Sequence, residues 1–188
     1  MSNFTVHSAA TAPGKSAELL NNAQAAFGFV PNLLGTFAEA PATLEGYLNI
    51  GQLFDQTSFT PTERQVVLLA VSAYNECHYC VAAHSTIAGM QKVPREVVDA
   101  IRDGRPIADD RLEALRRFAT AVVEHRGWVG DEAIADFIEA GFGRQQVLEV
   151  VLGVAMKTIS NYTNHIAGTP LDAAFAGEAW TSDQRQAS

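Results

Sequence analysis

The stretch TPTERQVVLLAVSAYNECHYCVAAH, residues 60–84, decides which kind of fold this chain adopts. Thr60 can cap a helix, Pro61 suits the first helical position, and Glu63 stands three residues after the cap. These residues form a capping box with a favourable proline. The apolar run Val66–Val71 could be a buried strand by composition alone. The capping signals and the length of the pattern favour a helix, apolar almost all round and therefore central in the fold.

The rest of the chain also shows helical spacing. No segment has sustained period-two alternation bounded by turn residues, so we expect no sheet. Asp109 or Asp110, and then Asp131, are the expected caps of two later helices. Besides the central helix, the predicted helices cover residues 15–27, 33–39, 42–54, 77–89, 94–102, 110–126, 131–140 and 144–165. The sequence therefore predicts an all-α helical bundle, with one domain over residues 1–180 and a polar tail at 181–188.

Composition excludes several classes of function. The chain has 188 residues, of which 47% are hydrophobic, enough to bury a core without disulfides or a structural metal. Its formal charge of −8 argues against binding a nucleic-acid backbone, which needs clustered lysine and arginine. No basic amphipathic stretch indicates a membrane surface, and the N-terminus lacks the pattern of a signal peptide. We therefore expect a soluble, cytoplasmic protein with neither a nucleic-acid nor a membrane partner.

The segment NECHYCVAAH, residues 75–84, holds both cysteines of the chain and a histidine four residues after the second. On a helix, Cys77, Cys80 and His84 share one face, because their spacings are three, four and seven. Cys77 lies near the helix start, where unpaired N–H groups and the macrodipole favour a thiolate. A nearby histidine can take the thiol proton, and two sulfurs in C-x-x-C can close a disulfide after one is oxidised. The pattern predicts a redox site with a nucleophile, a resolving partner and a base.

Two other uses of these cysteines stay open at this point. A zinc site could combine the two cysteines with His84 or His78, but a structural zinc needs four ligands. Only His165 offers a distant fourth ligand. The cysteines could also be small buried hydrophobes without chemistry. A thioredoxin-type fold does not fit, because its C-x-x-C follows a strand in a βαβ context that is missing here.

NECHYCVAAH, after the helix that begins TPTERQVVLLAVS, resembles the core motif of the carboxymuconolactone decarboxylase / alkylhydroperoxidase D superfamily. It is most similar to the peroxidase-related subgroup, over residues 60–90, and segments 161–166 and 169–172 are similar to the end of that subgroup. The resemblance implies an all-helical homo-oligomer, either a dimer, a trimer or a hexamer. It also implies thiol-dependent reduction of small hydroperoxides without a metal or cofactor, with electrons from an external dithiol.

The family's site residues map onto this chain one by one. The resemblance implies that Cys80 attacks the peroxide and that Cys77 resolves the product as a disulfide. His84 matches the histidine of the family's proton relay, and His78 matches the histidine between the cysteines. The relay's glutamate, twelve residues before the first cysteine, is Gln65 here. A neutral amide cannot accept a proton as a carboxylate does, so Gln65 can only orient His84 or a water by hydrogen bonding.

Four further residues bear on this site. Glu63 faces roughly the opposite side of its helix from the relay position and is a poor substitute for the missing glutamate. Asn164 and His165 can approach the cysteines if the helix 144–165 packs on them. Lys157 is the one charge in an apolar run, and we expect it to face a partner or solvent.

The leading interpretation is a peroxidase-type oxidoreductase with an antioxidant role, in which Cys80 and Cys77 react and His84 acts as acid–base partner. The helix-start argument favours Cys77 as the more acidic thiol, whereas the family mapping favours Cys80 as the attacking one. The alternative enzymes are a decarboxylase-like lyase and a disulfide reductase acting on a small substrate. The non-enzymatic alternative is a redox-sensing or metal-binding protein that uses the same cysteines.

Overall fold

The computed structural model describes residues 4–185 of the chain. Every regular element in this range is a helix, so the predicted all-α class is confirmed. The elements are α1 (Ser16–Phe27), α2 (Asn32–Phe37), α3 (Pro41–Asp55), α4 (Pro61–Tyr74), α5 (His78–Met90), α6 (Arg95–Asp103), α7 (Asp110–Glu124), α8 (Gly130–Glu139), α9 (Arg144–Ala167) and the 3₁₀ segments η1 (Ala173–Glu178) and η2 (Ser182–Arg185). Part of the predicted tail forms η2, and the part at 186–188 lies outside the described residues. None of these helices is both long and apolar enough to cross a membrane.

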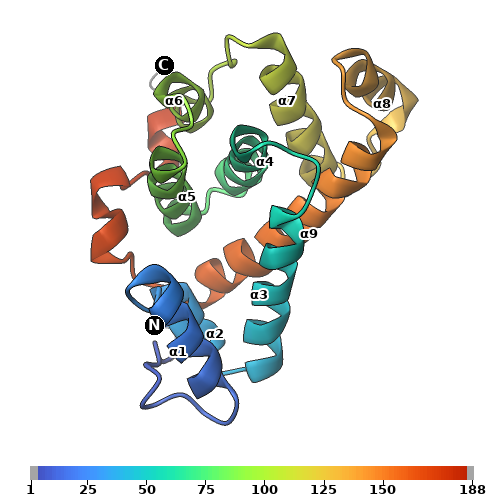
Figure 1. Cartoon of the computed structure of the whole chain (residues 1–188). Helices are drawn as coiled ribbons and strands as arrows, with labels where there is room; N and C mark the ends of the chain where they lie inside the picture. Colours follow the sequence, from blue (N-terminus) through green and yellow to red (C-terminus); the bar gives the residue numbers. More distant parts are fainter. Residues whose placement is uncertain (1–3, 186–188) are drawn as a thin grey trace.

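The α4 helix lies at the centre of the molecule, with α5, α6, α7 and α9 packed around it (Figure 1). Its predicted capping box is confirmed: the Thr60 hydroxyl accepts from the Glu63 N–H at 3.2 Å, and the Glu63 carboxylate accepts from the Thr60 N–H at 2.8 Å. Residues Val66–Val71 are all buried, as an all-round apolar helix requires. Glu63 also pairs with Arg111 of α7. The Glu63 carboxylate therefore stabilises the start of α4.

The α9 helix runs diagonally across the molecule from α8 to the N-terminal helices (Figure 1). Gly153 marks its closest approach to the core, since a Cβ there would lie 2.7 Å from Val67 Cγ1 and 2.9 Å from a ring carbon of Phe54. This face of α9 therefore packs tightly on α4 and α3. Further along the same face the buried residues are polar: Lys157, Ser160, Asn161 and Asn164.

The segment after α9 passes over α5 and joins it to α2. The Tyr79 hydroxyl donates to Asp172 Oδ2 at 2.5 Å and accepts from the Leu33 N–H at 3.2 Å. Asp172 also accepts from the Asn32 N–H at 3.1 Å, and both Tyr79 and Asp172 are buried. These bonds hold α2 over the start of α5.

The helix caps agree with the sequence in one place and differ in another. The Asp109 side chain accepts from the Leu112 N–H at 2.9 Å and so caps α7. The expectation that Asp131 caps α8 is wrong, because α8 already begins at Gly130. Gly130 has a φ of 77°, a left-handed conformation that lets the chain turn into the helix one residue earlier. Asp131 consequently lies in the first turn of α8.

Candidate active site

The turn between α4 and α5 places both cysteines in the interior. Glu76 takes a left-handed backbone conformation with a φ of 53°, and the Cys77 N–H donates to the Ser72 carbonyl at 2.9 Å. This bond closes the end of α4. Cys77 is then the N-cap of α5, which begins at His78. Cys77 and Cys80 are buried free thiols, whereas Glu76 is exposed.

The α9 helix supplies polar groups that face the two sulfurs. Asn164 Nδ2–H donates to Cys80 Sγ at 3.3 Å and lies 3.6 Å from Cys77 Sγ. Lys157 is fully buried, interacts with Cys80, and has its Nζ 2.9 Å from His84 Nε2. The expectation that Lys157 faces a partner or solvent is therefore wrong. The packing of α9 turns inward the helix face on which this lysine lies.

A chain of hydrogen bonds leads from His84 to the surface. His84 Nδ1 lies 3.1 Å from Gln65 Oε1, and Gln65 Nε2–H donates to Gln91 Oε1 at 3.1 Å. Gln65 and His84 are buried, and Gln91 is exposed. Burial, and then the charge of Lys157, hold the pKa of His84 well below its usual value. The imidazole is therefore neutral at physiological pH.

The surroundings make Cys80 the more acidic of the two thiols. Burial alone would raise its pKa, but the hydrogen bond from Cys77 and the positive charge of Lys157 outweigh burial and lower it. Hydrogen bonds from Ser160 and Asn161 act in the same direction. The pKa of Cys77 is raised, first because its thiol donates to Cys80 and then because it is buried. The backbone N–H of Cys80, at the start of α5, lowers the pKa of Cys77 but is outweighed. The position of Cys77 at the helix start therefore does not make it the thiolate.

Tyr47 of α3 is a residue of this cluster that the sequence analysis missed. Its hydroxyl forms a hydrogen bond with Ser160 and interacts electrostatically with Lys157 and Cys80. Burial is the largest influence and raises the pKa of Tyr47, so the phenol stays protonated. No local pattern could have found this tyrosine, because only the packing of α3 against α9 brings it to the sulfurs.

Two histidines of the sequence analysis lie apart from the sulfurs. His78 is exposed, and its ring meets the Trp180 ring edge-on at a centroid distance of 5.7 Å. Its role as a site residue, implied by the resemblance, stays a prediction. His165 is exposed and does not approach the cysteines, unlike its neighbour Asn164. Within residues 4–185, no group of three or more His, Cys, Asp or Glu side chains could hold a metal ion.

An apolar shell covers the sulfurs on the side of α1, α2 and α3. Its buried members include Leu20, Leu33, Leu34, Phe37 and Leu44. A cavity of about 260 Å³ lies beside this shell, between Phe37 and Thr43 on one side and Thr163 and Ala167 on the other. The last two residues flank Asn164 on α9.

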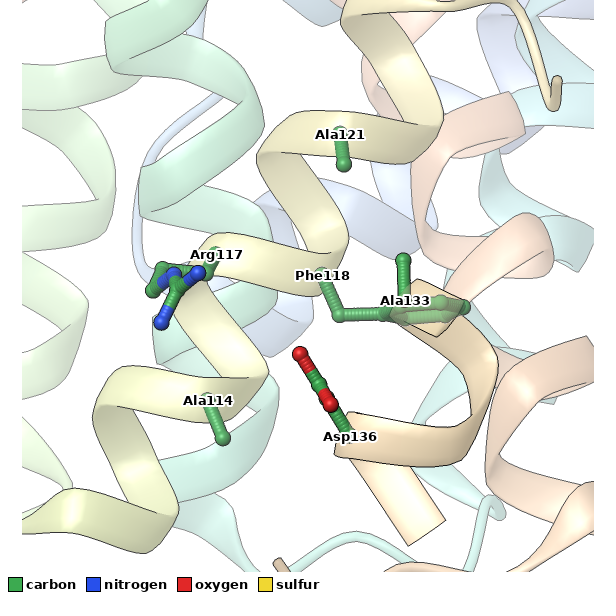
Figure 2. A pocket seen from close by; sticks show the side chains of 6 residues that line it. All are labelled: Ala114, Arg117, Phe118, Ala121, Ala133 and Asp136. Atoms are coloured by element: carbon green, nitrogen blue, oxygen red, sulfur yellow. The ribbon is translucent and has the colours of Figure 1, made fainter. Parts of the chain in front are cut away.

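A second hollow, of about 150 Å³, lies between α7 and α8. Figure 2 shows the Phe118 side chain reaching from α7 towards Ala133 of α8, with the Asp136 carboxylate below it. The residues that line this hollow include neither cysteine. The cluster around Cys77 and Cys80, rather than this hollow, is the candidate active site.

Comparison with known proteins agrees with this geometry. Residues 37–121, which contain both cysteines, match the sequence model of the carboxymuconolactone decarboxylase family. The chain is therefore similar to this family over that segment. The comparison with curated proteins gives no match.

Solved structures extend the likeness to nearly the whole chain. A peroxidase-related protein with an alkylhydroperoxidase AhpD core, from Ralstonia eutropha JMP134, is 24% identical with a TM-score of 0.82, over 93% of this chain and 94% of that one. A peroxidase-related protein from Silicibacter sp. TM1040 is 17% identical with a TM-score of 0.77, over 88% and 89%. The debrominase Bmp8, in a cysteine-to-alanine variant bound to 2,3,4-tribromopyrrole, is 18% identical with a TM-score of 0.78, over 95% and 96%. These likenesses establish the AhpD-like fold.

Proposed function

We propose that this protein, which is similar to the carboxymuconolactone decarboxylase family over residues 37–121, reduces small organic hydroperoxides with its two cysteines. The observation that carries the proposal is the setting of Cys80. Its buried sulfur receives hydrogen bonds from Cys77 and Asn164 and lies beside the ammonium of Lys157. Such a setting stabilises a thiolate, and the thiolate is the form of cysteine that attacks electrophiles.

The proposed reaction has three steps. The Cys80 thiolate attacks the terminal oxygen of the hydroperoxide, the O–O bond breaks, and a sulfenic acid and an alkoxide form. The alkoxide takes up a proton and leaves as the alcohol. The Cys77 thiol then attacks the Cys80 sulfenic acid, giving a disulfide and water. An external dithiol reopens the disulfide by exchange and is itself oxidised.

Two features of the site support a small, partly apolar substrate. The shell from α1 to α3 surrounds the sulfurs with hydrocarbon, which suits the organic part of an alkyl hydroperoxide better than hydrogen peroxide. Asn164 Oδ1 is buried and, within the described residues, has no hydrogen-bond partner. A buried acceptor beside the nucleophile can receive the O–H of a hydroperoxide, which satisfies both groups.

The proposal includes a homo-oligomer, either a dimer, a trimer or a hexamer. Large apolar side chains are exposed on several elements, among them Trp128 at 89% and Leu148 at 71%. Exposed apolar side chains of this size are common where copies of a chain associate. Sedimentation velocity on the intact protein checks this part, and a concentration-independent monomer contradicts it.

Consumption of cumene hydroperoxide in the presence of dithiothreitol tests the proposed function. The wild type is expected to turn over repeatedly, whereas Cys80→Ser consumes no peroxide. Without dithiothreitol, Cys77→Ser is expected to consume one equivalent and then stop as the sulfenic acid. Hydrogen peroxide in a parallel assay should react more slowly. A wild type no faster than Cys80→Ser with either peroxide contradicts the proposal.

The same assay can include a second electrophile. Because the debrominase Bmp8 shares the fold, 2,3,4-tribromopyrrole is a reasonable probe. Release of bromide by the wild type, without peroxide consumption, assigns the thiols to reductive debromination and overturns the choice of peroxide as substrate.

A further inference from the structure

We infer that Lys157 is the proton partner of Cys80, and that His84 holds this lysine in place rather than acting as the base. Lys157 thus forms a buried ammonium–thiolate pair with Cys80 in the reduced protein. The pair itself depends only on the geometry. Its part in turnover rests on the proposed function.

The hydrogen bonds of His84 leave it no free nitrogen for the thiol proton. An amide oxygen only accepts, so His84 Nδ1 must carry the hydrogen that binds Gln65 Oε1, 3.1 Å away. The other ring nitrogen, Nε2, is then an acceptor, and Lys157 Nζ donates to it at 2.9 Å. Both nitrogens are occupied, so the imidazole orients the lysine beside Cys80.

A buried ammonium needs a negative partner. Lys157 is fully buried, and among the residues described with side chains no carboxylate lies within ion-pair distance of it. The titratable groups that act on it are Cys80 and His84 from α5, Cys77 at the N-cap of α5, and Tyr47 from α3. Of these, His84 is neutral, and Tyr47 and Cys77 keep their protons. The thiolate of Cys80 is the counter-charge that remains.

This arrangement also explains the amide at position 65. A carboxylate there would favour a charged imidazolium, which would repel the neighbouring Lys157 ammonium and could no longer accept its hydrogen bond. Gln65 instead fixes the neutral tautomer of His84 and adds no charge. With one ammonium and one thiolate, the cluster stays neutral overall.

The Lys157–Cys80 pair accounts for every proton transferred in the proposed cycle. When the Cys80 thiolate attacks the hydroperoxide, Lys157 gives its proton to the departing alkoxide and becomes a neutral amine. Disulfide formation with Cys77 releases water and leaves the lysine neutral, as a buried amine without an anion should be. The reducing dithiol supplies two protons, of which one returns to the Cys77 thiol and the other to Lys157.

Thiolate titration tests the pair without any peroxide. In the Cys77→Ser background, the ultraviolet absorbance of the Cys80 thiolate is followed against pH with and without Lys157→Met, and with His84→Gln. The lysine variant should bring the thiol to an ordinary pKa of about 8.5 or above, so the thiolate fraction at pH 7 should fall about 30-fold. His84→Gln keeps an acceptor for the lysine and should leave most of the thiolate in place. If His84→Gln abolishes the thiolate while Lys157→Met keeps it, histidine is the base and the inference is overturned.

Carbon-13 NMR of the lysine side chain in the wild type covers the case in which Lys157→Met does not fold. The Lys157 Cε resonance is expected at the position of an ammonium in the reduced protein and of an amine in the disulfide form at neutral pH. An unchanged resonance overturns the inference. If the thiolate depends on Lys157 but the protein consumes no peroxide, the ammonium–thiolate pair is supported and only the proposed function is refuted.

Discussion

Removing the amide of Asn164 should change how Cys80 reactivity depends on pH. In the Asn164→Ala variant the sulfur loses the Nδ2–H that donates to it at 3.3 Å. The neighbours that remain, chiefly Cys77 and Lys157, still favour the thiolate. The variant should therefore keep a depressed thiol pKa, but a less depressed one than the wild type.

The size of this change follows from the hydrogen bond. A hydrogen bond to a charged group contributes about 1.5–3 kcal/mol, and a long bond to sulfur belongs at the lower end. Since one pKa unit corresponds to about 1.4 kcal/mol, the pKa of Cys80 should rise by about one unit in the variant. Nucleophilicity rises with thiol pKa, with a Brønsted coefficient of about 0.4–0.5, so the fully ionised thiolate should react about threefold faster.

Alkylation by iodoacetamide across pH, in the Cys77→Ser background, measures both effects. At acidic pH the Asn164→Ala protein should react about three- to fourfold more slowly than its parent, because about tenfold less thiolate is only partly offset by the higher nucleophilicity. At alkaline pH it should react faster, so the two curves cross.

Tyr162→Ala is the matched control, since Tyr162 is half-exposed on the same helix and contacts neither sulfur through any hydrogen bond described for it. Its curve should overlay that of the parent. If Asn164→Ala instead shifts the rate by one factor at every pH, the amide governs access to the sulfur and the reasoning about thiolate stabilisation is refuted.

Three further changes probe the scaffold and the charge on the thiol. Gly153→Ala should cost about 1–3 kcal/mol in urea unfolding, because its Cβ would meet Val67 at 2.7 Å, and an unchanged midpoint contradicts this tight crossing. Tyr79→Phe should lower the free energy of unfolding by about 1–3 kcal/mol, because it leaves the buried Asp172 carboxylate without its 2.5 Å donor, while thiol reactivity should stay the same. The reduced wild type should lose thermal stability on acidification more steeply than the double variant Cys80→Ser/Lys157→Met, which lacks both charges of the buried pair. In the wild type the folded-state thiol pKa is lowered, so below an ordinary pKa of about 8.5 the unfolded chain binds a proton that the folded chain does not. Equal pH slopes for the two proteins would count against a buried thiolate.

Local sequence signals predicted the elements well because they act within a few residues. The capping box at Thr60 fixed the start of the central helix, and the C-x-x-C spacing placed both sulfurs and His84 on one buried face. The contact of Gln65 with His84 was expected from the resemblance to the family's proton relay rather than from a local pattern. The start of α8 was misplaced because a left-handed glycine, rather than an acidic cap, sets it.

The polar half of the site depends on tertiary packing. Apart from Asn164, which was expected to approach the cysteines if its helix packs on them, it escaped the sequence analysis. Lys157 looked like a surface charge because its neighbours are apolar, yet it lies four residues after Gly153 on the face that packs against α3 and α4. A glycine four residues before a lone charge in an apolar helix is a signal that could have found it. Tyr47 carried no such signal, since its place beside Ser160 depends on how α3 docks on α9.

The central claim is that Cys80 is an attacking thiolate and Cys77 its resolving partner. Intact mass spectrometry with thiol alkylation, on metal-free protein before and after one equivalent of cumene hydroperoxide, tests it most directly. The wild type should lose both alkylatable thiols and the mass of two hydrogens, and Cys77→Ser should trap a sulfenic acid that Cys80→Ser cannot form. Two thiols that survive excess peroxide unchanged, or a sulfenic acid trapped on Cys77 in the Cys80→Ser variant, would contradict the account.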